Sequence, residues 1–283
     1  MKRLLFAFTS LFLFQLHAAA QPKKSGAIQF ESTFDPAAMA AANGIKLSDQ
    51  AIARMPQRSV TNFELLFNLT NASYMAVEDT EDSNNSGGSF GPGGGLRFGG
   101  FGGAGKDYYY NFDSHQLSQV FDLNDTTYVM PDKLGARTPG GNFGPEQATP
   151  VVNYSRTDET KKILGFTCYK VVMTTTVKRR IGDEEKEITD QTNLWFTNEL
   201  GFDFSPNPSM WTEGAVLAIE GKATHIFAKS IEFRNVSSRD VNLPKKVTTI
   251  SPEAFRSKME MRRKQMRGNR NGNNGQVRTI TIN

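Results

Sequence analysis

Two glycine-rich spacings within residues 82–106 have the form of active-site motifs. Gly87-Gly88-Ser89-Phe90-Gly91 has the spacing of a serine-hydrolase elbow, and Gly100–Gly105 has the spacing of a dinucleotide-binding loop. The elbow needs a strand before the serine and a helix after it, and the second motif needs a helix N-terminus facing the phosphates. Here the strand-like run Asp107–Tyr110 follows Gly105, and glycine-dense sequence surrounds Ser89. The pattern therefore indicates a surface loop of high backbone entropy, not an active site.

Residues that could hold a metal are sparse. Asp82–Gly87 resembles the first half of a calcium loop, but Gly93 stands where the loop needs a bidentate glutamate. A solvated acidic turn is expected, and a weak calcium site is the alternative, with ligands from Glu78, Asp79, Glu81 and Asp82. His115 and His225 offer too few ligands for a transition-metal site. No metal or cofactor is therefore predicted.

The single cysteine, Cys168, excludes an internal disulfide. A free thiol could act as a nucleophile, but Phe166, Tyr169 and Val171 surround this one in a strand-like run. That setting favours a buried small hydrophobe.

The N-terminus has the form of a secretory signal. Lys2 and Arg3 precede an apolar run over Leu4–Leu16, and Ala18–Ala20 forms a small-residue cleavage site before Gln21. The run is short for a membrane span, and no cysteine for lipid attachment lies near the cleavage site. We expect residues 1–20 to be a cleaved signal peptide, and the protein to be periplasmic or secreted and not a lipoprotein.

Charge is distributed unevenly along the chain. The formal net charge is +4, but residues 21–244 hold 21 Lys and Arg against 27 Asp and Glu, whereas residues 245–283 hold ten against two. An acidic body therefore carries a basic C-terminal segment, which could contact a membrane surface; nucleic acid is not expected as a partner outside the cytoplasm.

Alternating apolar and polar residues predict a mainly β protein. Strand patterns occur in Ile28–Ser32, Ser59–Asn68 and Ser73–Asp79, and then in close succession from Lys106 to Phe233. The short turns between them predict a single antiparallel sheet, strongly curved or forming a half-open barrel. Residues 21–244 are expected to form this β domain, with the glycine-rich loop at 82–106 within it.

Helix signals are few. In the helical insertion predicted over residues 35–55, Asp35 is the expected N-cap of a first short helix, and a second is expected before Pro56. Near the C-terminus Ser251 is the expected N-cap, Pro252 the first helical residue and Gly268 the end of a basic helix. Its apolar stripe is narrow, so the helix is expected to lie loosely on the body or to project from it, and the tail after it to be disordered.

Aromatic residues provide a candidate ligand or partner surface, and carboxylates provide the hydrolase alternative. The aromatic set is Trp195, Trp211, Phe204 and Tyr109. A hydrolase would need two carboxylates facing each other with a raised pKa, and the candidates are Glu64, Glu78, Asp113 and Asp122.

Several stretches resemble the GLPGLI family, exported proteins of Bacteroidetes. The most specific is "TDETKKILGFTCYK" (Thr157–Lys170), which is similar to the family's Thr-x-Glu-Thr-Lys-x-Ile-x-Gly-aromatic-x-Cys-x-Lys run; the aromatic stretch Lys106–Met130, Trp195-Phe196-Thr197 and the helix from Ser251 also resemble family segments. Where the family has its name-giving Gly-Leu-Pro-Gly-Leu-Ile, this chain has Trp211–Val216 and looks like a divergent member. The resemblance implies export and β architecture and brings no catalytic residues. We expect a non-enzymatic cell-envelope protein that binds a partner or an apolar ligand on a sheet face; the alternative is a carboxylate-dependent envelope hydrolase.

Overall fold

The computed structural model describes eight stretches of the chain. They are residues 25–42, 47–54, 58–77, 105–123, 125–136, 150–181, 184–210 and 213–272. The predicted signal peptide, nearly all of the glycine-rich loop and the C-terminal tail lie outside the described residues.

Strands dominate the described chain. They are β1 (Gly26–Phe34), β2 (Ser59–Phe67), β3 (Asn71–Val77), β4 (Asp107–Asn111), β5 (Gln116–Leu123), β6 (Thr126–Asp132), β7 (Val151–Ile163), β8 (Phe166–Ile181), β9 (Glu184–Thr197), β10 (Ala215–Glu220), β11 (Thr224–Phe233) and β12 (Thr248–Thr249). The helices are α1 (Pro36–Ala42), α2 (Asp49–Arg54), α3 (Ser238–Val241) and α4 (Pro252–Gly272).

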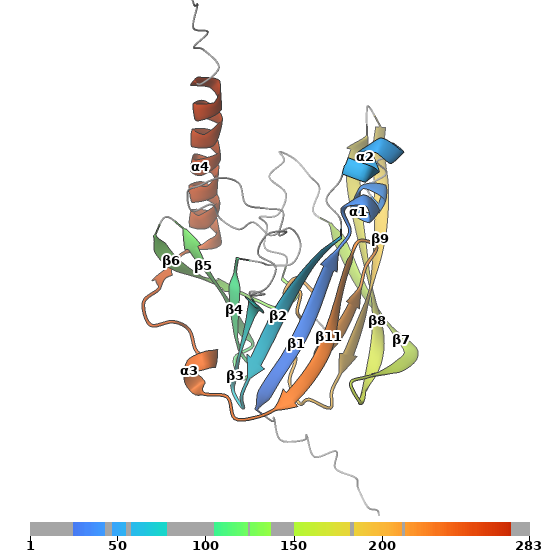
Figure 1. Ribbon diagram of the computed structural model, residues 1–283, viewed down its shortest axis with the longest axis vertical. Helices are drawn as coiled ribbons and strands as arrows, with labels where there is room; N and C mark the ends of the chain where they lie inside the picture. The colour runs from blue at the N-terminus through green and yellow to red at the C-terminus, as the bar shows by residue number, and fades with distance from the viewer. Residues whose placement is uncertain are drawn as a thin grey trace, which may run out of the picture.

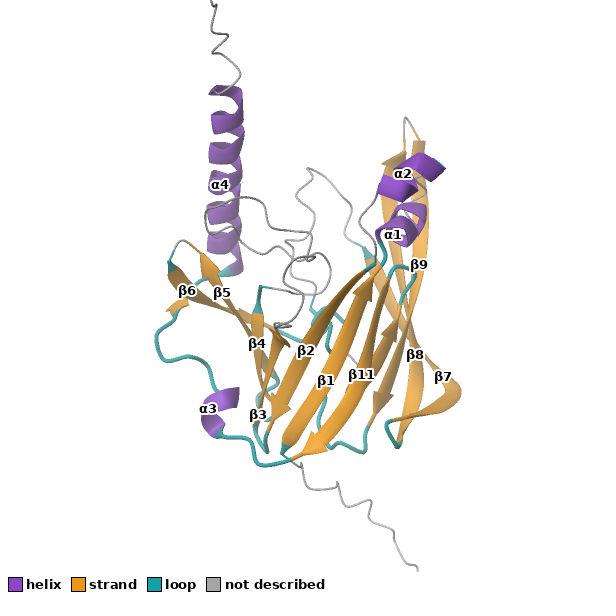
Figure 2. Ribbon diagram, viewed as in Figure 1, coloured by secondary structure: helices purple, strands orange, loops and turns teal. Residues whose placement is uncertain are grey.

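All twelve strands form one sheet, in the order β12-β6-β5-β4-β3-β2-β1-β11-β10-β9-β8-β7. Neighbours are antiparallel except the short β12, which runs parallel to β6. The two ends of the sheet do not pair with each other, and its flanks cross the central strands at a marked angle (Figures 1 and 2). The predicted mainly β, open and curved sheet is confirmed.

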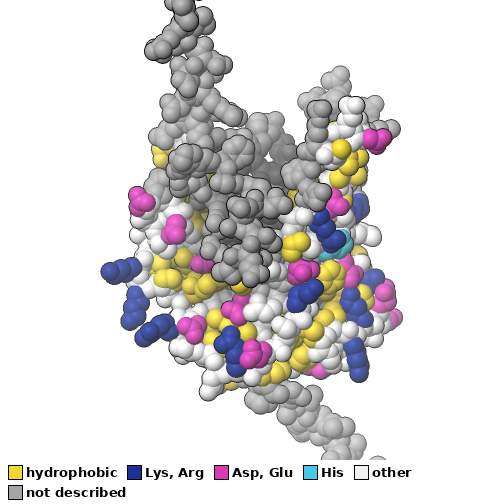
Figure 3. All heavy atoms as spheres, viewed as in Figure 1, with side chains coloured by type: hydrophobic (Ala, Val, Ile, Leu, Met, Phe, Trp, Pro, Cys, Tyr) yellow, Lys and Arg dark blue, Asp and Glu magenta, His cyan; other side chains and the backbone are white. Residues whose placement is uncertain are grey.

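Apolar and polar residues alternate along the strands, so the main hydrophobic core lies against one face of the sheet, here called the inner face. On β1 and β2 the fully buried inner residues are Ile28, Phe30, Phe63, Leu65 and Phe67. Successive side chains of a strand point to opposite faces, so the residues between them lie on the outer face. There Lys229 pairs with Glu31 and Arg234 with Glu64, and basic, acidic and apolar side chains mix on the surface shown in Figure 3.

The inner face is covered in part by the connection between β9 and β10. The described part of this segment, residues 198–210 and 213–214, carries Phe202 and Phe204 into the core. The ring of Phe202 lies 4.9 Å from that of Phe67, and the ring of Phe204 lies 5.4 Å from that of Tyr74. An irregular segment therefore fills space that a second sheet or a helix fills in many β proteins.

The predicted caps are present, but one predicted helix end is wrong. Asp35 accepts a hydrogen bond from the amide of Ala38, and Ser251 accepts one from the amide of Ala254, as N-caps do. Helix α4 continues through Gly268 to Gly272. A single glycine inside a helix lowers the stability of the helix by only about 1 kcal/mol. This cost does not end the helix unless the backbone also turns away from the helical conformation.

The β7–β8 hairpin turns on two residues with positive φ. Ile163 pairs with Phe166, and between them Leu164 has φ 51° and Gly165 has φ 88°. Two central residues with positive φ are typical of the type I′ hairpin turn. This hairpin is formed by the Thr157–Lys170 motif.

Candidate functional site

Trp195, on β9, contacts charged side chains of two other strands, Lys161 on β7 and Glu220 on β10. Its Nε1 donates to Oε2 of Glu220 at 3.0 Å, and Nζ of Lys161 lies 4.1 Å from the ring centroid. Lys161 also bonds Oε1 of Glu220 at 2.7 Å. Burial acts to raise the pKa of Glu220, but the hydrogen bonds from Lys161 and Trp195 hold it below its usual value. Because Trp195 is only 7% exposed, its role in the structure is to hold three strands together.

Two other predicted surface aromatics, Phe204 and Tyr109, are also buried and lie elsewhere. Phe204 is 2% exposed in the main core. Tyr109 lies on the outer face of β4, in a separate cluster with Val120 and Val129. Trp211 lies outside the described residues. The three described aromatics therefore do not form one surface.

Two cavities in the described residues combine polar and apolar groups. The first, here called the Asp107 pocket, has a volume of about 510 Å³ and is lined by Gly105, Asp107, Val120, Phe121, Asp122, Thr127, Pro244, Lys245 and Lys246. The second, here called the His115 pocket, has a volume of about 530 Å³ and is lined by Phe112, Asp113, His115, Asn198, Gly201, Phe202, Asp203 and Glu213.

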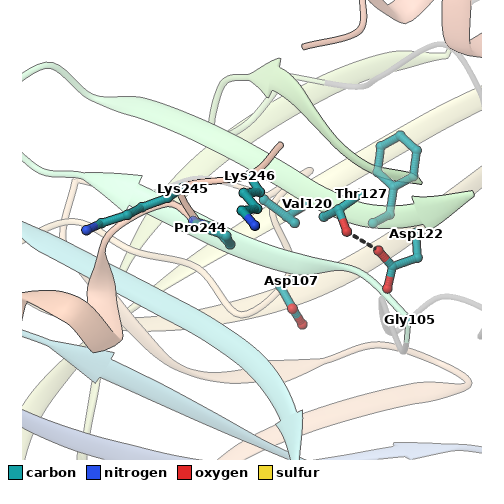
Figure 4. A pocket seen from close by; sticks show the side chains of 9 residues that line it. Gly105, Asp107, Val120, Asp122, Thr127, Pro244, Lys245 and Lys246 are labelled. Carbon is teal, nitrogen blue, oxygen red and sulfur yellow. Dashed lines mark hydrogen bonds between the residues drawn. The ribbon is translucent and has the colours of Figure 1, made fainter. Parts of the chain in front are cut away.

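The Asp107 pocket brings two carboxylates and two lysines to the outer face. Asp107 opens β4 and Asp122 lies near the end of β5, beside the segment Pro244–Lys246 (Figure 4). Burial and the neighbouring Asp122 raise the pKa of Asp107. The hydroxyl of Thr127 donates to Oδ1 of Asp122 at 2.6 Å, whereas no hydrogen bond of this kind is seen at Asp107 among the described contacts of the pocket. The two carboxylates therefore sit in unlike environments.

The His115 pocket lies where the β4–β5 turn meets the segment 198–214. His115 has φ 52°, an uncommon value for a residue other than glycine. Its Nδ1 lies 3.1 Å from the hydroxyl of Tyr110 and 3.4 Å from Oδ2 of Asp203. Phe112 and Phe202 form the apolar wall, with ring centroids 4.8 Å apart.

The proton positions in this pocket follow from the hydrogen bonds. The hydroxyl of Tyr110 donates to Oδ2 of Asp203 at 3.0 Å. Burial and Asp203 raise the pKa of Tyr110 well above its usual range, so the phenol keeps its proton. Because that proton points at Asp203, the oxygen of the Tyr110 hydroxyl can accept a hydrogen bond from Nδ1 of His115 in the tautomer that carries its proton on Nδ1.

The three described carboxylates of the four predicted for a hydrolase do not converge. Asp113 lines the His115 pocket and Asp122 lines the Asp107 pocket. Glu64 accepts a hydrogen bond from Gln29 at 2.6 Å on the outer face. Glu78 lies outside the described residues, as do the two glycine motifs apart from Gly105.

Neither Asp107 nor Asp203 was among the predicted site residues. The position of Asp107 beside Asp122 could have been predicted from the hairpin pattern. Asp107 on β4 pairs with Val120 on β5, and Val120 and Asp122 point to the same face of the sheet. Asp203 approaches His115 only through the path of an irregular segment, which strand periodicity does not predict.

Within the described residues, no group of three or more His, Cys, Asp and Glu side chains is placed to hold a metal ion. In the same part of the chain no helix is both long and apolar enough to cross a membrane.

No protein-family model and no curated protein matches the chain. Among solved structures, the chain is similar to one described as PNGF-II in a P21 space group, with a TM-score of 0.45 and 14% identity over 83% of this chain and 32% of that one. The chain thus spans about a third of that protein. A likeness of this degree carries no inference about function.

Proposed function

We propose that the protein is an exported, non-enzymatic binding protein of the cell envelope, a divergent member of the GLPGLI family, and that it holds a partner or small ligand at the His115 pocket. The observation that carries the proposal is the lining of that pocket, where the Phe112–Phe202 wall stands beside Asp113, Asp203 and Glu213. An apolar wall with a few oriented polar groups is typical of a recognition site.

The polar groups of this pocket are already bonded to one another. Tyr110, His115 and Asp203 form one cluster, and Glu213 is paired with Nη1 of Arg156 at 2.5 Å. These bonds orient the polar groups of the pocket toward a ligand. The described lining residues include no Ser, Thr or Cys, so recognition is favoured over nucleophilic catalysis by a hydroxyl or thiol.

The residues that line the His115 pocket also limit which kinds of ligand can bind there. Phe202 and Phe204 fill the centre of the inner face, so a wholly apolar ligand would have to displace them. A ligand with one apolar face and hydroxyl or protonated amine groups matches the pocket as it stands. Such a group could belong to a small molecule or to a side chain of an envelope protein.

Recovery of bound species from envelope fractions tests the proposal. The chain from Gln21 is compared with the double variant His115→Ala/Glu213→Gln and with the matched control Asp122→Asn in the other pocket, and bound lipids, small molecules and proteins are identified by mass spectrometry. We expect a species that copurifies with the wild type and the control and is reduced at least tenfold in the double variant. Equal recovery from all three, or recovery of nothing by the wild type, would overturn the assignment.

A second candidate function rests on the Asp107 pocket. A carboxylic acid with a raised pKa beside a second carboxylate is an arrangement used by acid–base hydrolases, including many glycosidases. If the pocket is catalytic, a panel of chromogenic glycosides and esters should contain a substrate whose hydrolysis is abolished by Asp107→Asn and by Asp122→Asn, and left intact by His115→Ala. Hydrolysis that survives both aspartate substitutions would rule this function out.

A further inference from the structure

One wall of the Asp107 pocket comes from a connection and not from the sheet. Residues 242–247 join α3 to β12, and within this connection Pro244, Lys245 and Lys246 line the cavity of about 510 Å³. The opposite wall is formed by strands β4, β5 and β6. The cavity therefore lies between a segment of irregular chain and the outer face of the sheet.

This connection is anchored to the body on both sides of the pocket. Before it, the side-chain amide of Asn71 donates to Oδ1 of Asn242 at 2.9 Å. After it, Val247 packs against the outer-face cluster that contains Val129, and the amide of Ile250 donates to the carbonyl of Val129 at 2.9 Å. The lysines of the pocket are thus carried by a segment with a fixed position over the strands.

The sheet side of the pocket presents two carboxyl groups. Asp122 is oriented by the hydroxyl of Thr127, which donates to Oδ1 at 2.6 Å. Burial and the neighbouring Asp122 raise the pKa of Asp107, so the ionised form of Asp107 is disfavoured in the empty pocket. A positively charged group placed between the two carboxyl groups would favour that ionised form again.

The lysines of the pocket do not supply this positive group. Among the described contacts, Lys245 and Lys246 form no ion pair, and neither does Asp107. In Figure 4 the two lysines lie toward one end of the pocket, and Asp107 and Asp122 lie toward the other. Groups of opposite charge therefore border one cavity without pairing directly, which suits a ligand that carries a positive group at one end and a negative group at the other.

We propose that the Asp107 pocket binds a short peptide by its two charged ends, with the α-ammonium group at the carboxylates and the α-carboxylate at the lysines. A simple cation or anion would match one end of the pocket and meet like charges at the other. In a free amino acid both charged groups are attached to one carbon atom, whereas each further residue adds about 3.3–3.6 Å between them. This inference goes beyond the binding proposed for the His115 pocket and does not require the Asp107 pocket to be catalytic.

Titration with tri-alanine and its blocked forms tests this inference. The chain from Gln21 is titrated with tri-alanine, with the N-acetylated peptide, with the C-amidated peptide and with free alanine, and binding is followed through the NMR shifts of the backbone amides. We expect shifts at Gly105, Val120 and Lys246 and binding that is about tenfold weaker when either end is blocked, as for loss of a charge-assisted hydrogen bond. Equal affinity for blocked and unblocked peptides, equal affinity for free alanine, or no binding of tri-alanine would overturn the proposal.

Two variants assign the ends of the peptide. Asp107→Asn should weaken the binding of tri-alanine about tenfold and leave that of the acetylated peptide unchanged, and Lys245→Gln/Lys246→Gln should act in the same way with respect to the amidated peptide. The matched control, Glu31→Gln/Lys229→Gln, removes an ion pair elsewhere on the outer face and should bind as the wild type does. Weaker binding in the control, or a variant that weakens all the peptides equally, would contradict the assignment. Circular dichroism establishes that each variant is folded, and the comparison of blocked peptides on the wild type depends on no variant. Peptide binding without hydrolysis would uphold this inference while the hydrolase function fails, and none of these substitutions touches the His115 pocket.

Discussion

Tyr74 buries a hydroxyl for which the described structure contains no hydrogen-bond partner. Its ring is packed between Phe63, stacked at 5.1 Å, and Phe30, edge-on at 6.0 Å. A buried hydroxyl without a partner costs about 1–3 kcal/mol, and burial accordingly raises the pKa of Tyr74 well above its usual value. The ring stabilises the core while the hydroxyl opposes burial.

The substitution Tyr74→Phe should therefore raise the free energy of unfolding by about 1 kcal/mol. Tyr110→Phe is the matched control, because the same atom is removed where it donates to Asp203. That variant should lose about 1–2 kcal/mol, since Asp203 loses a bonded partner. Urea unfolding followed by circular dichroism measures both. A destabilised Tyr74→Phe variant would mean that the hydroxyl has a partner after all.

Glu220 makes the Trp195 network sensitive to acid. Its pKa is held below the usual value by the bonds from Lys161 and Trp195, so its contribution to stability is complete above the pKa of an unfolded glutamate, about 4.3, and is lost as pH falls through the folded value. In the Glu220→Gln variant, the loss of folding stability that accompanies protonation of Glu220 should be absent.

The measurement is the urea midpoint between pH 6 and pH 3. The wild type should lose more stability than Glu220→Gln over this interval, with a change in tryptophan fluorescence as Trp195 loses its acceptor. Parallel curves for the two proteins would show that Glu220 is not linked to folding. Because the pair with Lys161 is partly exposed, high salt should reduce the difference.

At the scale of elements, the β7–β8 hairpin shows what the Thr157–Lys170 motif does. Gly165 needs positive φ, and Leu164 adopts it although leucine is strained there. Thr157 bonds the carbonyl of Lys170 within the irregular stretch between Arg156 and Thr160, and Nζ of Lys170 bonds Glu159 at 2.8 Å. Within the described residues the motif builds a turn, a bulge and the support of Trp195.

Leu164→Asn should consequently stabilise the protein by about 0.5–1 kcal/mol, because Asn-Gly is the preferred type I′ pair and the leucine side chain is 43% exposed. Gly165→Ala should destabilise it by about 1 kcal/mol through φ alone, since a Cβ at that position meets nothing within 4 Å. Thermal unfolding of both variants distinguishes strain from packing. A neutral Gly165→Ala would show that the turn relaxes at no cost.

The strands were predictable from the sequence because apolar and polar residues alternate wherever only one face of a strand is buried. Both predicted runs follow this rule: Ile28–Ser32 lies within β1, and Ser59–Asn68 covers β2 and extends one residue past its end. The pockets were not predictable in the same way. His115 and Asp203 meet because residues 198–210 fold irregularly over the inner face, and no periodic pattern encodes that path.

At the scale of the whole molecule, the described body is stabilised without a disulfide, and the single thiol of Cys168 can be used to follow its unfolding. The thiol is free and fully buried on β8, which pairs with β7 on one side and β9 on the other. Burial raises the pKa of the Cys168 thiol to about 11, so the reactive thiolate is scarce at pH 8. Reaction with a thiol reagent therefore requires exposure of the sheet interior.

Labelling of Cys168 at pH 8 should follow global unfolding. The free energy obtained from the ratio of labelling rates in buffer and in 6 M guanidinium should equal that from urea unfolding, because separating β8 from both neighbours removes the core it supports. A Cys168→Ala/Tyr154→Cys control places the thiol at a position 44% exposed on β7, where labelling should need no unfolding. If Cys168 labels as fast as the control, the β7–β8 hairpin opens locally and the sheet is not one cooperative unit. A reducing agent should leave the unfolding midpoint unchanged in either case, since the chain has one cysteine and forms no internal disulfide.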